Sequence, residues 1–260
     1  MIACIWTAAT GMAAQQENMD VIANNLANSN TTGFKASRAN FEDLMYQDVI
    51  PPGAETSNGN KVLTGIQLGM GTKTQSVQKI YSEGNLKETD NSLDLAIQGN
   101  GFFKVLQGTQ EAYTRAGNFS LDKDGYICDA NGNRLQPEVS IPQGAVTINI
   151  DSGGTLTALD QNGNVLTTQT LSIYSFPNPS GLLSVGKNYA LPTAASGQAQ
   201  EGQPGTEGFG TLLQGYLENS NINVVQEMVN MIAGQRAYEA NSKVIKAADQ
   251  MLQIANNVQS

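Results

Sequence analysis

Apolar residues near the N-terminus recur at three- and four-residue steps. Counting Gln15 as its polar member, the stripe joins Ile5, Ala8, Met12, Met19, Ile22 and Leu26. This heptad-like spacing predicts a helix with a narrow apolar seam over residues 1–30. We expect the helix to stop at residues 28–33, where Asn, Ser, Thr and Gly accumulate and Gly33 can adopt a left-handed conformation.

The C-terminal end repeats this pattern more strongly. A helix over residues 223–258 would be about 54 Å long, with Asn221 or Asn223 as its N-cap. Such a helix cannot bury its narrow seam by itself. We therefore expect its partner to be the N-terminal helix, other subunits or both. The stripe contains Val224, Met228, Met231, Gln235, Tyr238, Ser242, Ile245, Ala248, Leu252 and Ala255.

Between the two ends the period changes to two. Short apolar runs are separated by pairs that favour hairpin turns, namely Asn58-Gly59, Asp124-Gly125, Asn131-Gly132 and Asn162-Gly163. Strands are predicted at residues 102–105, 146–150 and 171–176. The Gly-, Gln-, Ala- and Pro-rich residues 192–210 are predicted to be a loop or linker. The middle therefore indicates an all-β module, barrel-like or sandwich-like.

The predicted fold class is α+β. Long N- and C-terminal helices form a coiled-coil-like core, and a mostly antiparallel β domain is inserted between them. This arrangement suits a filament subunit whose ends build a shared core, which indicates an assembly role. The predicted parts are a core helix and its following segment (1–45), an extended segment (46–71), an outer β domain (72–215) and a second core helix (216–260).

Charge supports this division. Charged residues make up only 14% of the chain, against about a quarter in ordinary proteins. The net charge is −9, which argues against nucleic acid or an anionic membrane as a partner. Residues 1–45 carry −2 and residues 217–260 carry −1, while residues 46–216 carry −6. The ends are thus nearly neutral, and the acidic middle is predicted to be the soluble part.

Candidate chemistry is sparse, and we predict no catalytic residue, cofactor or metal. Histidine is absent, which excludes His-based triads and zinc sites. Cys4 and Cys128 fit no redox or metal motif, although a disulfide between them remains possible on count alone. A calcium loop has glycine at its sixth place and glutamate at its twelfth, but counted from Asp129 these places hold Arg134 and Ser140. Counted from Asp122, the fifth place holds Tyr126, so the match fails again and hairpin turns explain residues 122–133 better.

Two further patterns are weighed and set aside. The glycines at 99 and 101 lead into a predicted strand, whereas a phosphate-binding loop leads into a helix. Carboxylate pairs at 42/43 and 90/94 could serve a glycosidase in principle, but with 23 acidic residues most are expected to be solvated. The N-terminus has no basic residue before its apolar run, and no apolar run approaches 18 residues. Neither a secretory signal nor a membrane span is therefore predicted.

Two long motifs at opposite ends of the chain carry a family resemblance. Residues 23–28 (ANNLAN) and 32–38 (TGFKASR) resemble the N-terminal signature of flagellar rod, hook and hook-associated proteins. Residues 220–243 resemble the matching C-terminal motif, and residues 99–103 and 113–119 resemble the central β domain. Residues 46–71 are similar to an extended stretch found in distal rod members.

The resemblance implies a structural subunit of the distal rod, polymerised helically into a straight hollow shaft that transmits torque and encloses an export channel. It implies type III export without a cleaved signal, a place in the basal body across the periplasm, and contacts with copies of itself. Proximal rod, hook and surrounding ring proteins are the other implied partners. Two rivals remain open: another rod or hook member, and a secreted wall-cleaving or sugar-binding β protein.

The residues expected to mediate assembly follow from the stripes and the motifs together. Those of the N-terminal helix and signature are Ile5, Met12, Met19, Ile22, Asn24, Asn25, Leu26, Asn28, Gly33, Phe34 and Lys35. Those of the C-terminal helix are Asn223, Val224, Met228, Met231, Gln235, Arg236, Tyr238, Ser242, Ile245 and Leu252. Those of the rod-type segment are Pro51, Pro52, Gly53, Gly65, Leu68 and Gly69.

Overall fold

A computed structural model describes residues 2–51, 53 and 63–259. The chain divides into two compact units. Unit 1 contains residues 1–26, 37–78 and 223–260, and unit 2 contains residues 27–36 and 79–222. Each unit is therefore built from separate stretches of the chain. The α+β fold class with a helix at each end is confirmed, and the strands of the β domain pair antiparallel, as in β7–β8, β7–β11 and β12–β13.

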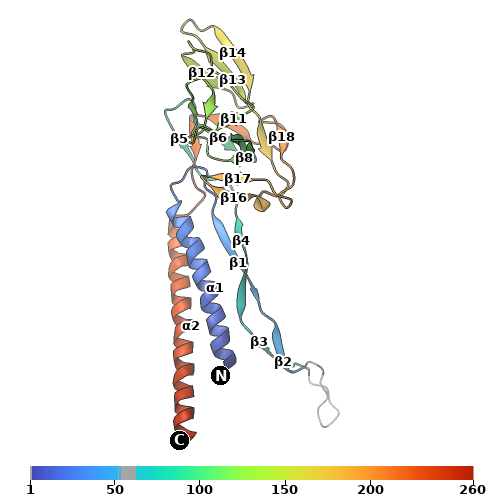
Figure 1. The fold of residues 1–260 in the computed structure, drawn as a ribbon, viewed down its shortest axis with the longest axis vertical. Helices are drawn as coiled ribbons and strands as arrows, with labels where there is room; N and C mark the ends of the chain where they lie inside the picture. The colour runs from blue at the N-terminus through green and yellow to red at the C-terminus, as the bar shows by residue number, and fades with distance from the viewer. Residues whose placement is uncertain (1, 52, 54–62, 260) are drawn as a thin grey trace. The chain divides into compact units, whose positions relative to one another are not determined.

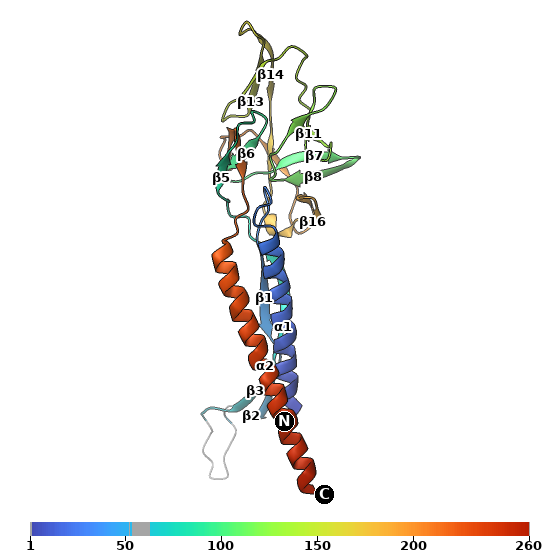
Figure 2. The same cartoon turned by 90° about the vertical axis from the view of Figure 1, so that its left-hand side faces the viewer.

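Unit 1 contains both helices, α1 (Ile2–Ala27) and α2 (Val224–Gln259), which run antiparallel and side by side (Figures 1 and 2). Asn223 caps α2, because its Oδ1 accepts a hydrogen bond from the Gln226 N–H at 3.2 Å. Glu227 in the first turn also suits the helix dipole. The prediction of Asn223 as a possible N-cap is thus confirmed.

Small residues let the two helices approach closely. A Cβ added at Gly11 would lie 2.9 Å from Asn241 Nδ2, and one added at Gly234 would lie 3.4 Å from Met19 Cγ. Ala8, Ala14 and Ala248 are also buried. The side of α2 that faces inward includes buried Gly234 and Ala248 and half-buried residues at Glu227, Met231, Asn241, Ser242, Ile245 and Leu252.

Only some residues of the predicted C-terminal stripe therefore lie on the buried side of α2. Val224, Met228, Gln235, Tyr238 and Ala255 are exposed in the single chain, so α1 does not cover them, and their packing against other subunits stays a prediction. The physical reason is that a close helix contact selects small side chains. A search for apolar periodicity passes over glycine and asparagine, which stand nearest to α1.

A two-stranded ribbon completes unit 1. Strands β1 (Ser37–Asp43) and β4 (Thr72–Lys79) pair, and β2 (Tyr46–Ile50) pairs antiparallel with β3 (Ile66–Gly69). The ribbon packs on α1 through Gly71, whose φ is +113° and where a Cβ would clash with Thr10 Oγ1. Thr72 N–H donates to the same Oγ1 at 3.4 Å. All side chains of β2 and β3 are exposed.

Unit 2 contains the remaining strands and a short 3₁₀ helix, η1 (Pro179–Gly181). A seven-stranded sheet has the order β16–β17–β8–β7–β11–β10–β9, and a three-stranded sheet has the order β12–β13–β14. The pairs β15–β18, β19–β6 and β20–β5 complete the unit. The strands are β5 (Leu86–Glu88), β6 (Leu95–Gln98), β7 (Phe103–Gln107), β8 (Gln110–Thr114), β9 (Ser120–Leu121), β10 (Ile127–Cys128), β11 (Arg134–Gln136), β12 (Thr147–Ile150), β13 (Thr155–Leu159), β14 (Val165–Thr170), β15 (Ile173–Ser175), β16 (Leu183–Gly186), β17 (Tyr189–Leu191), β18 (Gln200–Gly202), β19 (Thr211–Gln214) and β20 (Tyr216–Glu218).

Alternating burial along these strands builds the core of unit 2. In β7, Phe103 and Val105 are buried while Lys104 between them is half-buried, and β13 alternates in the same way. Phe103 meets Phe119 edge to face, with ring centroids 5.1 Å apart. Each such large side chain stabilises the fold by about 1.5–3 kcal/mol through burial. The predicted strands in the middle of the chain are therefore confirmed.

The prediction of a loop over residues 192–210 was wrong in one part. Residues Gln200–Gly202 form β18, which pairs with β15. Gly202 is required there by packing, since a Cβ would lie 2.3 Å from the Phe209 ring. The glycine that suggested a loop thus allows an aromatic ring to cover a strand. Of the predicted turn pairs, Gly125, Gly132 and Gly163 adopt positive φ as expected, and Asn58-Gly59 lies outside the described residues.

Candidate assembly site

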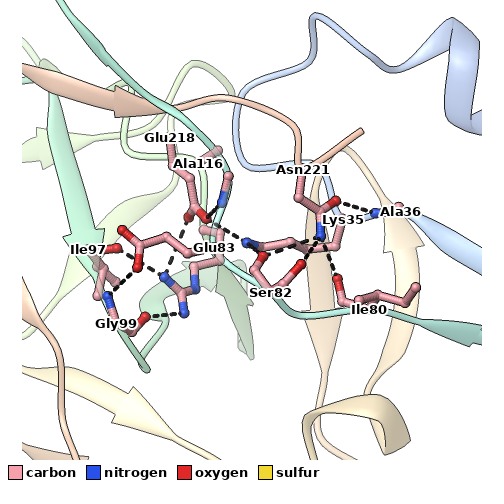
Figure 3. Close-up of polar contacts among 12 residues, drawn as sticks. Lys35, Ala36, Ile80, Ser82, Glu83, Ile97, Gly99, Ala116, Glu218 and Asn221 are labelled. Atoms are coloured by element: carbon pink, nitrogen blue, oxygen red, sulfur yellow. Dashed lines mark hydrogen bonds and ion pairs between the residues drawn. The ribbon is translucent and has the colours of Figure 1, made fainter. Parts of the chain in front are cut away.

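The two family-like motifs meet within unit 2. Residues 27–36, which follow α1, lie beside β20 and residues 219–222, which precede α2. Gly33 N–H donates to the Glu218 carbonyl at 2.8 Å, and Ala36 N–H donates to Asn221 Oδ1 at 2.8 Å. Asn221 Nδ2 in turn donates to the carbonyl of Ile80 at 2.9 Å (Figure 3). One asparagine therefore joins three separate stretches of the chain.

A buried ion cluster lies at the centre of this junction. Glu218 is fully buried, and its Oε1 accepts hydrogen bonds from Lys35 Nζ at 2.5 Å and from Gly84 N–H at 3.0 Å (Figure 3). Its Oε2 lies 3.4 Å from Arg115 NH1. Lys35 Nζ also donates to the Ser82 carbonyl at 2.7 Å. The carboxylate thus fixes groups from the N-terminal signature, from residues 82–84 and from the end of β8.

Burial disfavours the charged forms of Lys35 and Arg115 in this cluster. Desolvation lowers the pKa of Lys35, and the Glu218 carboxylate raises it again only in part. Desolvation likewise lowers the pKa of Arg115, although its guanidinium donates to the carbonyls of Ile97 at 3.2 Å and Gly99 at 2.6 Å. The hydrogen bonds hold the charged forms in place. Removing one partner of such a buried pair would leave the other uncompensated.

Gly33 lets the N-terminal signature lie against the end of β8. Its φ is +68°, and an added Cβ would lie 2.5 Å from the backbone N of Ala116. No side chain fits in that space, because the neighbouring atoms are backbone. The half-buried Phe34 follows, with Lys79 Nζ 5.7 Å from its ring centroid. The predicted left-handed glycine is thus confirmed, although α1 already ends at Ala27.

Asn25 has a comparable place in unit 1. Its Oδ1 accepts from the Ser37 N–H at 2.9 Å, and its Nδ2 donates to the Ser37 carbonyl at 2.8 Å and to Glu227 Oε2 at 3.5 Å. It is 2% exposed. This single amide therefore ties the last turn of α1 to the start of β1 and to the first turn of α2. Asn28 lies in the next turn, where its Oδ1 accepts from Thr31 Oγ1 at 3.2 Å.

The structure places the predicted assembly residues in three different environments. Asn25, Ile22, Gly33 and Lys35 are buried, whereas the other predicted residues of α1 and its signature are half-buried except for the exposed Asn24. The exposed predicted residues of α2 are Asn223, Val224, Met228, Gln235, Arg236 and Tyr238. In the rod-type segment, Gly65 is half-buried, Pro52 lies outside the described residues, and the exposed residues are Pro51, Gly53, Leu68 and Gly69.

Sequence reasoning missed three residues that organise the junction: Glu218, Arg115 and Asn221. Each stands in or beside a quoted motif, but neither periodicity nor composition indicates which polar residues are buried. A buried carboxylate between a lysine and an arginine is a tertiary feature. No local signal marks Glu218, because Tyr216 and Leu217 before it are both apolar and β20 shows no alternation.

A second feature of unit 1 is a large amount of exposed apolar surface. Along α2, Val225 is 71% exposed and Ile254 is 63% exposed. On the ribbon, Met45 is 85% exposed and Leu63 is 96% exposed. Soluble monomers rarely expose apolar patches of this kind, and such patches mark interaction sites. The other exposed apolar residues on these elements include Tyr46, Val49, Ile66, Leu68, Met228, Val229, Ile232, Val244 and Met251.

One member of each carboxylate pair considered from the sequence contacts neighbouring side chains. Asp94 accepts hydrogen bonds from Thr89 Oγ1 at 2.8 Å and Asn91 Nδ2 at 2.9 Å, while Glu42 pairs with Lys73 at 2.8 Å. Within the described ranges, no group of three acidic or cysteine side chains is placed to hold a metal ion. No helix among the described residues has the length and apolar character needed to span a membrane.

Asp129 likewise organises a hairpin turn. Its Oδ1 accepts from the N–H groups of Asn131 at 2.8 Å and Asn133 at 3.0 Å. Its Oδ2 accepts a short hydrogen bond from the Tyr189 hydroxyl. Burial, together with this carboxylate, raises the pKa of Tyr189 to about 12. The interpretation of residues 129–133 as a turn is therefore confirmed.

Comparison with known proteins identifies the family. Three family models match: "Flagella basal body rod protein" over residues 5–35, "Flagellar hook protein FlgE/F/G D1 domain" over 96–158, and "Flagellar basal body rod FlgEFG protein C-terminal" over 213–258. A flagellar basal-body rod protein FlgG of Buchnera aphidicola is 48% identical over 255 residues, covering 97% of this chain and 98% of the relative. The chain belongs to the flagellar basal-body rod protein family.

Other relatives extend this finding across distant bacteria. FlgG of Caulobacter vibrioides is 48% identical over 257 residues, covering 98% of both chains. FlgG of Bacillus subtilis is 36% identical over 261 residues, covering 97% of both chains. The relatives are structural flagellar proteins, and the family is not one of enzymes. The resemblance drawn from the terminal motifs is confirmed, and the rival interpretation as a wall-cleaving protein is not supported.

Proposed function

We propose that this chain is a subunit of the distal rod that polymerises helically into a straight, hollow drive shaft. The shaft transmits torque from motor to hook and encloses the export channel. The observation that carries this proposal is the exposed apolar surface of α2, which a soluble monomer would not maintain without a partner. Head-to-tail contacts that do not close into a ring give a helical tube.

The same proposal covers location and partners. The protein lies in the flagellar basal body, crosses the periplasm as part of the rod, and is exported by the type III apparatus without a cleaved signal. Its neighbours are further copies of itself, the proximal rod proteins, the hook protein and the surrounding outer-membrane and peptidoglycan ring proteins. The names of the relatives support a basal-body rod assembly, and the finer contacts remain predictions.

The elements receive roles within this proposal. Helices α1 and α2 form a coiled-coil-like inner core, supported by the close approach at Gly11 and Gly234. The β2–β3 ribbon braces one subunit against the next, supported by its exposed apolar side chains. Unit 2 forms the outer layer, supported by the acidic charge of the middle of the chain. The four-part division drawn from the sequence stays a prediction.

The test compares assembly with monomer mass. Electron microscopy of concentrated protein should show straight hollow tubes, and the mass at low concentration should be that of a monomer. The double variant V229D/I232D places two charges on exposed positions of α2, at 54% and 51% exposure, and should remain folded but not polymerise. The matched control is Val165→Asp on β14, which is 59% exposed in unit 2 and should polymerise normally. Tubes formed equally by both variants would contradict the role of α2.

A further inference from the structure

A small cavity lies beside the buried ion cluster in unit 2. Its volume is about 30 Å³, and its walls include Lys35, Lys79 and Arg115 together with the rings of Phe34, Tyr81 and Phe102. A cavity needs about 10–15 Å³ of this kind of space to hold one water molecule. The cavity therefore has room for one or two water molecules or for one monatomic ion.

The cations around this cavity have hydrogen-bond donors without acceptors. Arg115 is 5% exposed, and its Nε–H has no partner within the described part of the chain. Lys79 has no carboxylate within 4.0 Å in the same ranges, and its charge lies 5.7 Å from the Phe34 ring centroid. Burial lowers the pKa of Lys79, so its ammonium group lacks full hydration. A buried donor without a partner costs about 1–3 kcal/mol, which a bound acceptor would recover.

Three other polar groups of the wall already have partners of their own. The Tyr113 hydroxyl lies 3.3 Å from Glu111 Oε2, the Tyr189 hydroxyl binds Asp129, and Thr114 Oγ1 accepts from the Ala116 N–H. In the cluster itself, Lys35 and Arg115 face the carboxylates of Glu218 and Glu83, and Glu83 is already held by the Gly99 N–H at 3.1 Å. Among the described residues, Lys79 is therefore the cation of the cavity wall that has no carboxylate partner.

We propose that this cavity binds one small monovalent anion of halide size, which in solution is chloride. An anion would accept a hydrogen bond from the free N–H of Arg115 and from the ammonium group of Lys79, and it would give Lys79 a counterion. The aromatic walls are compatible with this ligand, because the edges of aromatic rings carry positive partial charge. The small size of the cavity favours a monatomic anion over a larger oxyanion such as sulfate. The anion would stabilise the junction between the N-terminal signature, residues 79–84 and β20.

The test measures thermal unfolding of the full-length monomer while chloride replaces gluconate at constant ionic strength. Ligand that binds only the folded state raises the midpoint, by roughly 3–6 °C at ten times its Kd for a unit of this size. The rise should saturate with chloride concentration and should be absent with sulfate. The variant Lys79→Met keeps an apolar stem over Phe34 and should lose the chloride dependence.

The matched control is Lys87→Met, which removes the same charge from an exposed position on β5. It should keep the wild-type chloride dependence. A second measurement does not depend on any variant: crystals grown in bromide should show an anomalous peak within about 4 Å of Lys79 Nζ and Arg115 Nε. A flat chloride response in the wild type, or a bromide-free cavity filled only with water, would overturn the proposal.

Discussion

At the scale of single residues, the ion cluster around Glu218 should dominate the stability of unit 2. Glu218→Ala would leave Lys35 and Arg115 buried without their shared carboxylate. Losing one partner of a buried ion pair costs about 3–5 kcal/mol. We expect a loss of this size in the free energy of unfolding, measured by urea denaturation followed by tyrosine fluorescence.

The control for this experiment is an exposed ion pair in the same unit. Asp124 lies 3.7 Å from Arg134, which also contacts Asp122 and Glu138, and its side chain is 52% exposed. Exposed pairs contribute at most about 1 kcal/mol, so Asp124→Ala should have little effect. Equal losses for the two variants would mean that Glu218 contributes no more than a surface charge.

Gly33 gives a second prediction at this scale. In Gly33→Ala, the methyl group meets both an unfavourable φ and the backbone of residues 115–116, with the nearest atom at 2.5 Å. Strain of this kind costs roughly 1–3 kcal/mol, and relief of the clash requires the signature to move. Gly108→Ala separates the two effects, since its φ is +65° and no atom lies within 4 Å of an added Cβ.

We therefore expect Gly33→Ala to lower the thermal midpoint of unit 2 clearly more than Gly108→Ala does, and differential scanning calorimetry measures both. The Gly33 variant should also weaken the protection of the Ala36 N–H against hydrogen exchange, because its bond to Asn221 depends on the same segment. Equal decreases in the thermal midpoint for the two variants would mean that the close approach of Gly33 to residues 115–116 does not contribute to stability.

The sequence contained the residues of the junction but not their geometry. Gly33 and Lys35 were identified because they stand in a recognisable motif with a turn signal. Glu218 was not identified, because the lysine that pairs with its buried carboxylate is 183 positions away in the chain. Motifs record which residues matter locally, whereas the pairing of buried charges depends on the folded backbone.

At the scale of elements, periodicity predicted both helices and the strands at residues 102–105, 146–150 and 171–176, but it did not predict the remaining strands or the helix contact. Gly11 and Gly234 lie at close contacts between α1 and α2, and Ala248 is buried, yet none of the three is strongly apolar. The predicted stripe instead combined inward residues such as Ile245 with exposed ones such as Tyr238. The exposed face of α2 is itself rich in apolar residues, so a single chain offers two overlapping stripes.

The β2–β3 ribbon gives a prediction at the same scale. Leu44 N–H donates to the Gly71 carbonyl at 2.9 Å, so the chain can be closed there after residues 46–69 are replaced by an Asn-Gly turn. Because all side chains of β2 and β3 are exposed, the shortened protein should keep the thermal midpoint of unit 2. Its assembled tubes should be shorter or bend more, as measured from their contours by electron microscopy.

The outcome that contradicts this role is specific. Shortened protein that forms tubes of normal length and stiffness would show that the ribbon does not brace neighbouring subunits. A lowered midpoint for unit 2 would instead show that the deletion damages the fold, and the contour measurement would then need a shorter deletion. The two readouts therefore separate assembly from stability.

At the scale of the whole molecule, charge should limit polymerisation. Each subunit carries a net charge of −9, and most of it lies in the middle of the chain, while the apolar surface lies on α2 and the ribbon. Bringing many copies together therefore gains apolar burial and costs repulsion between like charges. Salt screens that repulsion, because the Debye length falls from about 30 Å at 0.01 M salt to about 10 Å at 0.1 M.

We expect the critical concentration for tube formation to fall several-fold between 0.01 M and 0.2 M salt, as measured by sedimentation of polymer at a series of protein concentrations. Lowering the pH from 7 toward the pI near 4.5 should act in the same direction, because protonation of carboxylates removes the same repulsion. The series is run in sodium gluconate, so that binding of a small anion does not contribute. A critical concentration that rises with salt would mean that subunits are held together mainly by ion pairs, and that the apolar surface of α2 is not the principal contact.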